Sequence, residues 1–379
     1  MLLVLVPAFS VAAVPPPSEL WIDDGVTEVE VFGDAIYSGD GWEYDADLDV
    51  LILDGFDGVY IYAEGDLDIV LDGENYAECI EADGDLSISG SGTLDLDCSY
   101  YVALYAGGNL SLSGSAIVSA ESDNSDGVYA GGDITVSDSA ELYGYGGYIG
   151  IDADGSITVS DSAILSGDGR LGGVGATGDI IVSGSATLYG DGYYGGIYAG
   201  GDITASGNAT LTGAGWDGIW AYGNILFSGS VKVTGTGAME TDGGYSYGIY
   251  AYGTLEIDLA VGEDFFVEGK GVIAEGEGGL YGGGIVSEGS IIQLGSNTEV
   301  VVPTGGKVVE LNEDYGDTSA IGINDETSAH AKVQGKKAPP TGDSTTAGLL
   351  IMTMILSMGT AVFSGFKFWT ETDPLAEIL

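Results

Sequence analysis

The sequence predicts an all-β protein, a single parallel β-helix (a solenoid of about nine rungs of 19–30 residues) with a cap at each end. One segment recurs: aliphatic, any, Ala, any, Gly, a small polar residue that we call the anchor, then an aliphatic residue. Apolar and polar residues alternate within each copy, which is the period of a β-strand. The Gly before each anchor suits a tight bend. The anchors are Asp66, Asp85, Asn109, Asp133, Ser156, Asp179, Asp202, Asn224 and Thr254.

Two further positions in each copy predict the interior of the solenoid. Ala stands three residues before every anchor and an aliphatic residue stands five before it, so both face the core. The Ala is expected to mark a cramped corner. One rung buries about five aliphatic side chains at roughly 1.5–3 kcal/mol each, whereas ordering roughly 20 residues costs about 1–2 kcal/mol per residue. A single rung is therefore unstable, and neighbouring rungs must stabilise one another.

The composition excludes several classes of protein. The chain of 379 residues has a formal net charge of −51, and no Lys or Arg precedes Arg170. Nucleic-acid binding needs basic patches and is excluded. A hydrophobic fraction of 45% argues against disorder. The acidity either keeps the protein soluble or binds cations, and both interpretations stay open.

The first 60 residues are expected to contain a signal and a cap. Residues 1–14 are apolar and include the small residues Val11, Ala12 and Ala13, which is typical of a secretory signal peptide near its cleavage site. They lack the usual positive start, which indicates a truncated signal; an apolar first strand is the alternative. Residues 15–60 form the expected N-terminal cap, because the open end of a solenoid needs an atypical unit.

The segments after the repeats, which span 61–257, are predicted in three parts. Residues 258–325 hold one degenerate rung at 284–291 and a C-terminal cap, a strand pair at 300–302 and 308–311. Residues 326–346 are polar and form a linker, which contains the single histidine, His330. Residues 347–366 are apolar and uncharged, long enough for a transmembrane helix, and are followed by a tail, 367–379.

The linker ends in a short motif before this apolar segment. Ala338, Pro339, Pro340, Thr341 and Gly342 resemble the cell-wall sorting signal of Gram-positive surface proteins, Leu-Pro-any-Thr-Gly followed by a membrane helix and a basic tail. The resemblance implies that sortase cleaves after Thr341 and links it to peptidoglycan outside the cell. Ala338 stands where Leu is usual, and the tail is acidic. A membrane anchor with the same topology is the alternative.

The two cysteines occupy equivalent positions in neighbouring copies. Cys79 and Cys98 each follow their own anchor by 13 residues. Such positions stack at about 4.8 Å, which is within the Cα separation of about 4.4–6.8 Å found in disulfides. A secreted chain allows the bond. A reduced pair of small buried residues fits equally well, so both alternatives stay open.

An aromatic residue often stands four residues before the anchor, where the strand period points it outward. Stacked rungs would align these rings in a row that could stack on sugar rings. The alternative is that the rings only stabilise neighbouring strands. The carbohydrate-binding candidates are Tyr62, Tyr105, Tyr129, Tyr198, Trp220 and Tyr250.

Acidic residues near the first two anchors are candidates for a calcium site. Glu64, Asp66, Asp83 and Asp85 face outward on neighbouring rungs. Like charges about 4.8 Å apart repel by about 1 kcal/mol in water and about 3.5 kcal/mol at an effective dielectric of 20. Ca²⁺ with its oxygen ligands would relieve this repulsion. A solvated acidic surface without metal is the alternative.

The repeats also resemble a known group of proteins. The segment Trp42-Glu43-Tyr44-Asp45, the apolar run 48–53 and the first copy, 58–67, are similar to repeat-rich surface proteins of clostridial-type bacteria. These are often grouped with a carbohydrate-binding β-helix family. The resemblance implies a fold like that of pectate lyases, with Ca²⁺ and acidic polysaccharide as ligands.

The repeats offer little for catalysis. Arg170 and Lys232 are their only basic residues and stand three rungs apart, and no Ser, His and Asp set is present because His330 falls in the linker. We therefore expect no enzyme. The expected function is binding of carbohydrate, a polysaccharide or a host or plant glycan, or adhesion at the cell surface. A structural stalk is the alternative, and a polysaccharide-degrading enzyme is a third reading.

Overall fold

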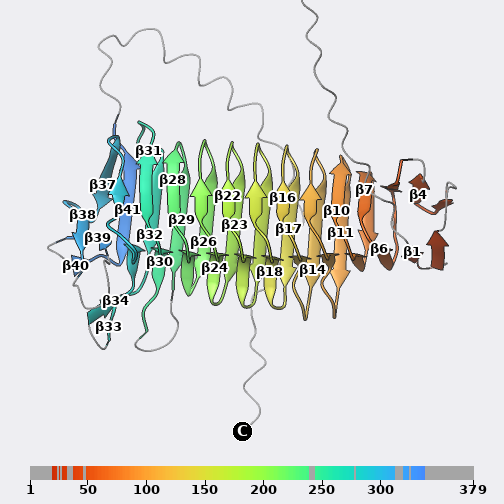
Figure 1. The fold of residues 1–379 in the computed structure, drawn as a ribbon, viewed down its shortest axis with the longest axis horizontal. Helices are drawn as coiled ribbons and strands as arrows, with labels where there is room; N and C mark the ends of the chain where they lie inside the picture. Colours follow the sequence, from red (N-terminus) through yellow and green to blue (C-terminus); the bar gives the residue numbers. More distant parts are fainter. Residues whose placement is uncertain are drawn as a thin grey trace, which may run out of the picture. The chain divides into compact units, whose positions relative to one another are not determined.

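The computed structural model describes residues 19–23, 25, 28–31, 37–45, 48–238, 244–276, 279–311, 319–323 and 326–337. These residues form the predicted parallel β-solenoid, and no helix occurs among them. The chain passes through three sheets, A, B and C, and then starts the next turn (Figure 1). The first full turn consists of β6 (Tyr60–Glu64), β7 (Leu67–Asp72) and β8 (Glu74–Ala77).

Sheet A contains the residues that precede each anchor. Its inward positions are the predicted aliphatic residues and alanines, such as Ile197 and Ala199, both fully buried. Each pairs in register with its equivalent on the next turn, as Ile197 does with Ile219. After β6 its parallel strands are β9 (Cys79–Ala82), β12 (Leu104–Ala106), β15 (Val128–Ala130), β18 (Ile149–Ala153), β21 (Gly172–Ala176), β24 (Gly195–Ala199), β27 (Asp217–Ala221), β30 (Tyr247–Ala251) and β35 (Gly283–Ser287).

Sheet B begins directly after each anchor. The aliphatic residue after the anchor and the one two positions later point inward, as Ile203 and Ala205 do. Its parallel strands are β5 (Val50–Asp54), β7, β10 (Leu86–Gly90), β13 (Leu110–Leu112), β16 (Ile134–Val136), β19 (Ile157–Val159), β22 (Ile180–Val182), β25 (Ile203–Ala205), β28 (Ile225–Gly229), β31 (Leu255–Leu259) and β36 (Gln293–Leu294).

Sheet C closes each turn and meets sheet A at a corner built from glycine. A Cβ on Gly190 would lie 2.1 Å from the carbonyl oxygen of Gly196, so the two backbones touch. The backbones are therefore cramped at this glycine pair, while the alanines of sheet A are buried inward positions. After β8 the parallel strands are β11 (Thr93–Cys98), β14 (Ile117–Ser122), β17 (Glu141–Gly146), β20 (Ile164–Gly169), β23 (Thr187–Gly192), β26 (Thr210–Gly215), β29 (Lys232–Gly237) and β32 (Phe266–Lys270).

The anchors form a continuous polar ladder along the bend between sheets A and B. The side-chain oxygen of each anchor accepts the backbone N–H of the anchor on the next turn. Asp66 Oδ1 accepts from Asp85 at 2.7 Å, and Asp202 Oδ1 accepts from Asn224 at 2.6 Å. The same contact continues from Asp66 to Thr254. The ladder explains why Asp, Asn, Ser or Thr occupies the position, because each carries an acceptor oxygen.

Antiparallel strands extend the sheets at the N-terminal end. β1 (Glu19–Asp23) lies beside β6 with β2 (Glu28–Val31) outside it, and β4 (Trp42–Asp45) lies beside β5 with β3 (Tyr37–Gly39) outside it. Cys79 and Cys98, on β9 and β11, form a disulfide with a Cα separation of 5.5 Å.

The C-terminal end differs from the expectation in two ways. The two valine-rich segments, β37 (Thr298–Val302) and β38 (Lys307–Glu310), do not pair with each other. Instead, β37 pairs with β41 (His330–Gly335), and β38 pairs with β39 (Ser319–Ile323), which extends sheet A. Residues 330–335 of the predicted linker are therefore a strand, which lies between β32 and β37 in sheet C. β40 (Glu326–Thr327) pairs with β39, and β33 (Ala274–Gly276) pairs with β34 (Gly279–Tyr281).

Candidate binding face on sheet A

The six predicted aromatic residues all lie on the outer face of sheet A, but they do not form one row. Tyr105 pairs with Tyr129, and Tyr198 pairs with Trp220. Asp152 and Gly175 occupy the two turns between these pairs. The outer face thus has an N-terminal aromatic group and a C-terminal one, separated by a carboxylate and a position without a side chain.

The N-terminal group is held by hydrogen bonds to neighbouring acids. The Tyr62 hydroxyl donates to Asp83 at 2.9 Å, and the Tyr129 hydroxyl donates to Asp154 at 2.8 Å. These bonds raise the pKa of both tyrosines to about 12, because ionisation would break them and bring two negative charges together. The rings of Tyr105 and Tyr129 stack with centroids 5.5 Å apart. Ring faces and hydroxyls in this group are therefore partly used within the protein.

The C-terminal group contains one candidate that is not exposed. Tyr198 and Trp220 are half-buried, with ring centroids 5.0 Å apart. Tyr250 is only 8% exposed, because it packs against Val286 and Val309, and its hydroxyl donates to Glu288. The outward direction of Tyr250 follows the strand period, but strands β38 and β39 extend sheet A beside it. Tyr250 therefore cannot serve as a sugar platform.

Several exposed aromatic residues were not among the sequence candidates. Tyr222 and Tyr252 stand two residues before their anchors, are 50% and 51% exposed, and extend the group because Tyr222 contacts both Trp220 and Tyr252. Others, namely Tyr193, Tyr194 and Trp216, lie in the bends before β24 and β27. Both positions, two residues before the anchor and just before the strand of sheet A, can be inspected in the sequence of each repeat, and this would identify these residues. We call the following set the aromatic face: Tyr193, Tyr194, Tyr198, Trp216, Trp220, Tyr222 and Tyr252.

A bare stretch of backbone lies beside the aromatic face. Gly172 and Gly195 are paired in register on β21 and β24, and both are partly exposed. A Cβ on Gly172 would come no closer than 3.7 Å to any other residue, and one on Gly195 no closer than 3.9 Å. Neither has a positive φ. The absence of side chains here is therefore not required by packing, in contrast to the glycine corner.

Two half-buried carboxylates lie near this stretch. Asp217 on β27 pairs directly with Gly195, whereas Asp152 on β18 pairs with Gly175, three residues after Gly172, and its Oδ1 is 2.9 Å from where a Cβ on Gly175 would stand. Burial raises the pKa of each to about 6, and the nearby charge of Asp126 adds to the effect at Asp152. Asp217 Oδ1 accepts the Tyr247 N–H at 2.8 Å. Both groups can accept hydrogen bonds at the surface and are partly protonated in mild acid.

The four calcium candidates do not converge into a ligand set. Oδ1 of Asp66 and Oδ1 of Asp85 accept backbone N–H groups of the anchor ladder, and Asp83 accepts the Tyr62 hydroxyl. Glu64 is exposed at the end of β6. Throughout the described residues, no group of three or more His, Cys, Asp or Glu side chains is arranged to hold a metal ion.

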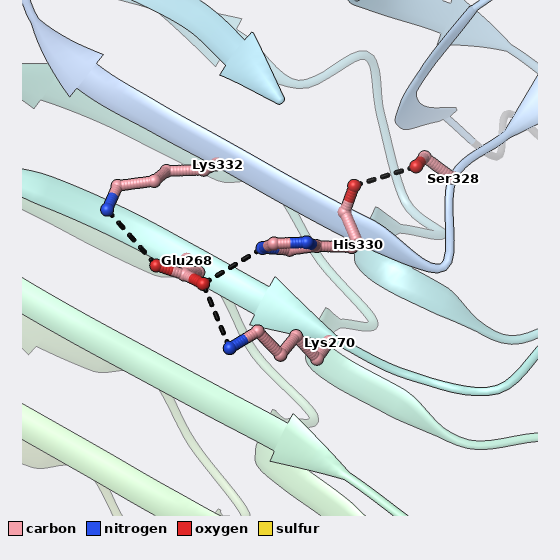
Figure 2. A network of polar contacts seen from close by, with 5 residues as sticks. All are labelled: Glu268, Lys270, Ser328, His330 and Lys332. Atoms are coloured by element: carbon pink, nitrogen blue, oxygen red, sulfur yellow. Dashed lines mark hydrogen bonds and ion pairs between the residues drawn. The ribbon is translucent and has the colours of Figure 1, made fainter. Parts of the chain in front are cut away.

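The basic residues of the repeats lie far apart. Arg170 follows β20, and Lys232 begins β29, three strands further along sheet C, which is roughly 14 Å across the strands at about 4.8 Å each. The two residues are also offset along the strands, because Lys232 is in register with Ile164 and not with Arg170. His330 instead faces Glu268 across β41 and β32 (Figure 2). Glu268 also pairs with Lys270 at 3.0 Å and Lys332 at 3.1 Å. This cluster joins β41 to β32, and the hydroxyl of the neighbouring Ser328 donates to the backbone oxygen of His330 rather than to its ring (Figure 2).

The predicted signal peptide, sorting motif and apolar helix, at 1–14, 338–342 and 347–366, lie outside the described residues. Within the described part of the chain, no helix has the length and apolar character needed to cross a membrane. Comparison with protein-family models, curated proteins and solved structures finds no match for this chain.

Proposed function

We propose that this protein is a non-enzymatic, surface-anchored β-solenoid that binds carbohydrate through the aromatic face. The observation that carries the proposal is the contact group of Tyr198, Trp220 and Tyr222, whose rings are partly exposed on a rigid sheet. Aromatic rings on ordered strands can stack on the C–H faces of sugars with little loss of side-chain entropy. Carboxylates beside them provide acceptors for sugar hydroxyls.

The proposed location rests on the sequence and on one structural feature. A disulfide between Cys79 and Cys98 is typical of proteins outside the reducing cytosol. The signal-like residues 1–14 and the motif at 338–342 support secretion followed by attachment to the wall or membrane. Replacing Thr341 by Ala should then release the protein from the wall fraction, and sortase treatment of a peptide spanning 335–346 should cleave it after Thr341. Retention of the variant in the wall would contradict sorting at this residue.

A structural stalk is the second candidate function. It is favoured by the anchor ladder, which bonds every turn from Asp66 to Thr254 to the next one. Such a ladder stabilises a long solenoid whether or not a ligand binds. The two functions differ in what they require of the aromatic face: carbohydrate binding needs the exposed rings for contact with sugar, whereas a stalk needs the rings only to stabilise neighbouring strands.

The test is a glycan-array screen of the full chain, with Ca²⁺ and with a chelator. The proposal expects binding that a Tyr198→Ala/Trp220→Ala variant loses. A matched variant, Tyr143→Ala/Tyr189→Ala, removes two partly exposed tyrosines from the outer face of sheet C and should bind normally. Circular dichroism shows whether each variant is folded. No binding under either condition would favour the stalk, and binding only with Ca²⁺ would restore the calcium proposal.

A further inference from the structure

We infer that the bare stretch at Gly172 and Gly195 is a subsite for an uncharged polysaccharide, whose chain runs along the solenoid axis with Tyr194 and Trp216 on one side and Tyr198 and Trp220 on the other. The inference rests on the proposed carbohydrate binding and adds its position and ligand chemistry. It starts from the two glycines, because neither packing nor backbone conformation requires glycine at these positions.

The first step is the shape of the surface around the glycines. Tyr194 lies one residue before Gly195 and is 56% exposed, and Tyr198 lies three residues after it. The two tyrosines are about 13 Å apart along the strand, at about 3.3 Å per residue. Between them Gly172 and Gly195 leave two neighbouring strands without outward side chains at this position. A flat ring can therefore approach the backbone here, flanked by aromatic groups on both sides.

The second step is the direction of the ligand. The row through the two glycines passes Ile149, Gly172, Gly195 and Asp217 on successive strands, which makes three strand spacings, or roughly 14 Å at about 4.8 Å each. One strand spacing is comparable to the length of one pyranose unit. An extended chain along this row would therefore meet Ile149 at one end and Asp217 at the other, with the two glycines between them. Affinity should rise with oligosaccharide length until this span is covered.

The third step is the charge of the ligand. Asp217 pairs with Gly195, Asp152 pairs with Gly175 on the same strand as Gly172, and both carry negative charge at neutral pH within a chain of net charge −51. An acidic sugar would be repelled at this site. Arg170 stands two residues before Gly172 and is the only Lys or Arg before Lys232 in the sequence. Uncharged sugars with hydroxyl donors fit the carboxylates best.

The experiment adds side chains at the two glycines of the bare stretch in the full-length protein. Gly195→Leu and, separately, Gly172→Leu place a side chain on the outer face of sheet A. Thr204→Leu adds a comparable side chain to the outer face of sheet B on the same turn as Gly195 and serves as the matched control. Binding is measured by calorimetry with neutral β-linked glucan oligosaccharides of increasing length and with oligouronates. Thermal unfolding checks that each variant is folded.

The inference expects either glycine variant to weaken neutral-glucan binding by roughly tenfold or more, about 1.4 kcal/mol, with Thr204→Leu unchanged. Full binding by both folded glycine variants would overturn it, while loss of binding in Tyr198→Ala/Trp220→Ala would still support the proposed function. Binding of oligouronates alone, lost in Arg170→Ala, would overturn the assignment to uncharged chains. If no glycan binds the parent protein, the proposed function and the inference both fail.

Discussion

At the scale of single residues, glycine has two different roles in this solenoid. At the corner between sheets C and A it is required, because a Cβ on Gly190 would stand 2.1 Å from the Gly196 carbonyl oxygen. On the outer face of sheet A, Gly195 has open space around it. The same residue type therefore marks close packing at one position and, by our inference, access for a ligand at another.

Substitution by alanine should separate these roles. We expect Gly190→Ala to destabilise the protein by at least about 1–3 kcal/mol, because the backbones must move apart. Gly195→Ala should leave stability unchanged or raise it by up to about 1 kcal/mol through lower entropy of the unfolded chain. Denaturant unfolding of the two variants beside the parent measures the difference. Equal stability of the two variants would contradict the corner geometry.

The anchor ladder gives a second prediction at this scale. Asp202→Ala removes the oxygen that accepts the Asn224 N–H at 2.6 Å. Water can reach this bond, so we expect a loss at the lower end of about 0.5–1.5 kcal/mol. Asp202→Asn keeps the acceptor and removes one charge from an acidic row, so its stability should equal or exceed that of the parent. A loss in Asp202→Asn as large as in Asp202→Ala would mean that the charge, rather than the acceptor, matters.

The repeat pattern predicts inward residues well and outward ones poorly. The Ile, Ala and Leu ladders follow from the strand period, because burial selects the same residue type in every copy. The outer face has no such selection, so a single position, four before the anchor, predicts its exposed aromatic residues only in part. Tyr222 and Trp216 occupy other positions, and Tyr250 occupies the predicted position but is buried beside strands that the repeat does not reveal.

At the scale of elements, the C-terminal end shows what local patterns cannot predict. The segment 330–335 is short and polar, so its local pattern predicts a linker. Its inward residues, Ala331 and Val333, complete sheet C only because β32 leaves an open edge beside which they can pair. β37 likewise pairs with β41, which is distant in the sequence, and not with β38, which follows it directly. Pairing between segments so far apart in the sequence depends on where the solenoid ends.

Glu268 joins β41 to β32, which leads to a prediction about acid. Burial raises the pKa of Glu268, but the hydrogen bonds from Lys270, Lys332 and His330 outweigh it and lower the pKa to about 2. A lowered carboxyl pKa stabilises the folded state above the unfolded value of 4.5, and this contribution is lost as pH falls from about 4.5 to about 2. Hydrogen exchange of β41 amides should accelerate in that range.

A variant distinguishes this effect from general acid unfolding. Glu268→Gln keeps the shape of the side chain but cannot form the ion pairs, so its β41 amides should already exchange faster at pH 7. They should then change little between pH 4.5 and pH 2 relative to amides of β23 in the middle of the stack. Identical exchange in the parent and the variant at pH 7 would show that main-chain pairing alone holds β41.

At the scale of the whole molecule, acidic side chains oppose folding at neutral pH. The net charge of −51 repels itself, and carboxylates on the outer faces stack along the solenoid. Burial, followed by the charge of neighbouring acids, raises the pKa of Glu121 and Asp168 on sheet C. Regular stacking therefore stabilises the core, but it also places like charges only one strand spacing apart. A globular fold would spread these charges further apart.

This arrangement predicts that the protein is most stable in mild acid. For Asp152 and Asp217 the folded pKa of about 6 lies above the ordinary aspartate value of 3.8, so the folded state takes up protons first, and stability rises as pH falls from about 6 towards 4. Loss of the Glu268 contribution begins only below about 4.5. We expect a higher melting temperature at pH 5 than at pH 7, and added salt should reduce this difference in melting temperature by screening the repulsion.

The double variant Asp152→Asn/Asp217→Asn should melt higher than the parent at pH 7, and its melting temperature should rise less than that of the parent between pH 7 and pH 5. A parent protein that melts lower at pH 5 than at pH 7 would show that these carboxylates are better solvated than their burial implies.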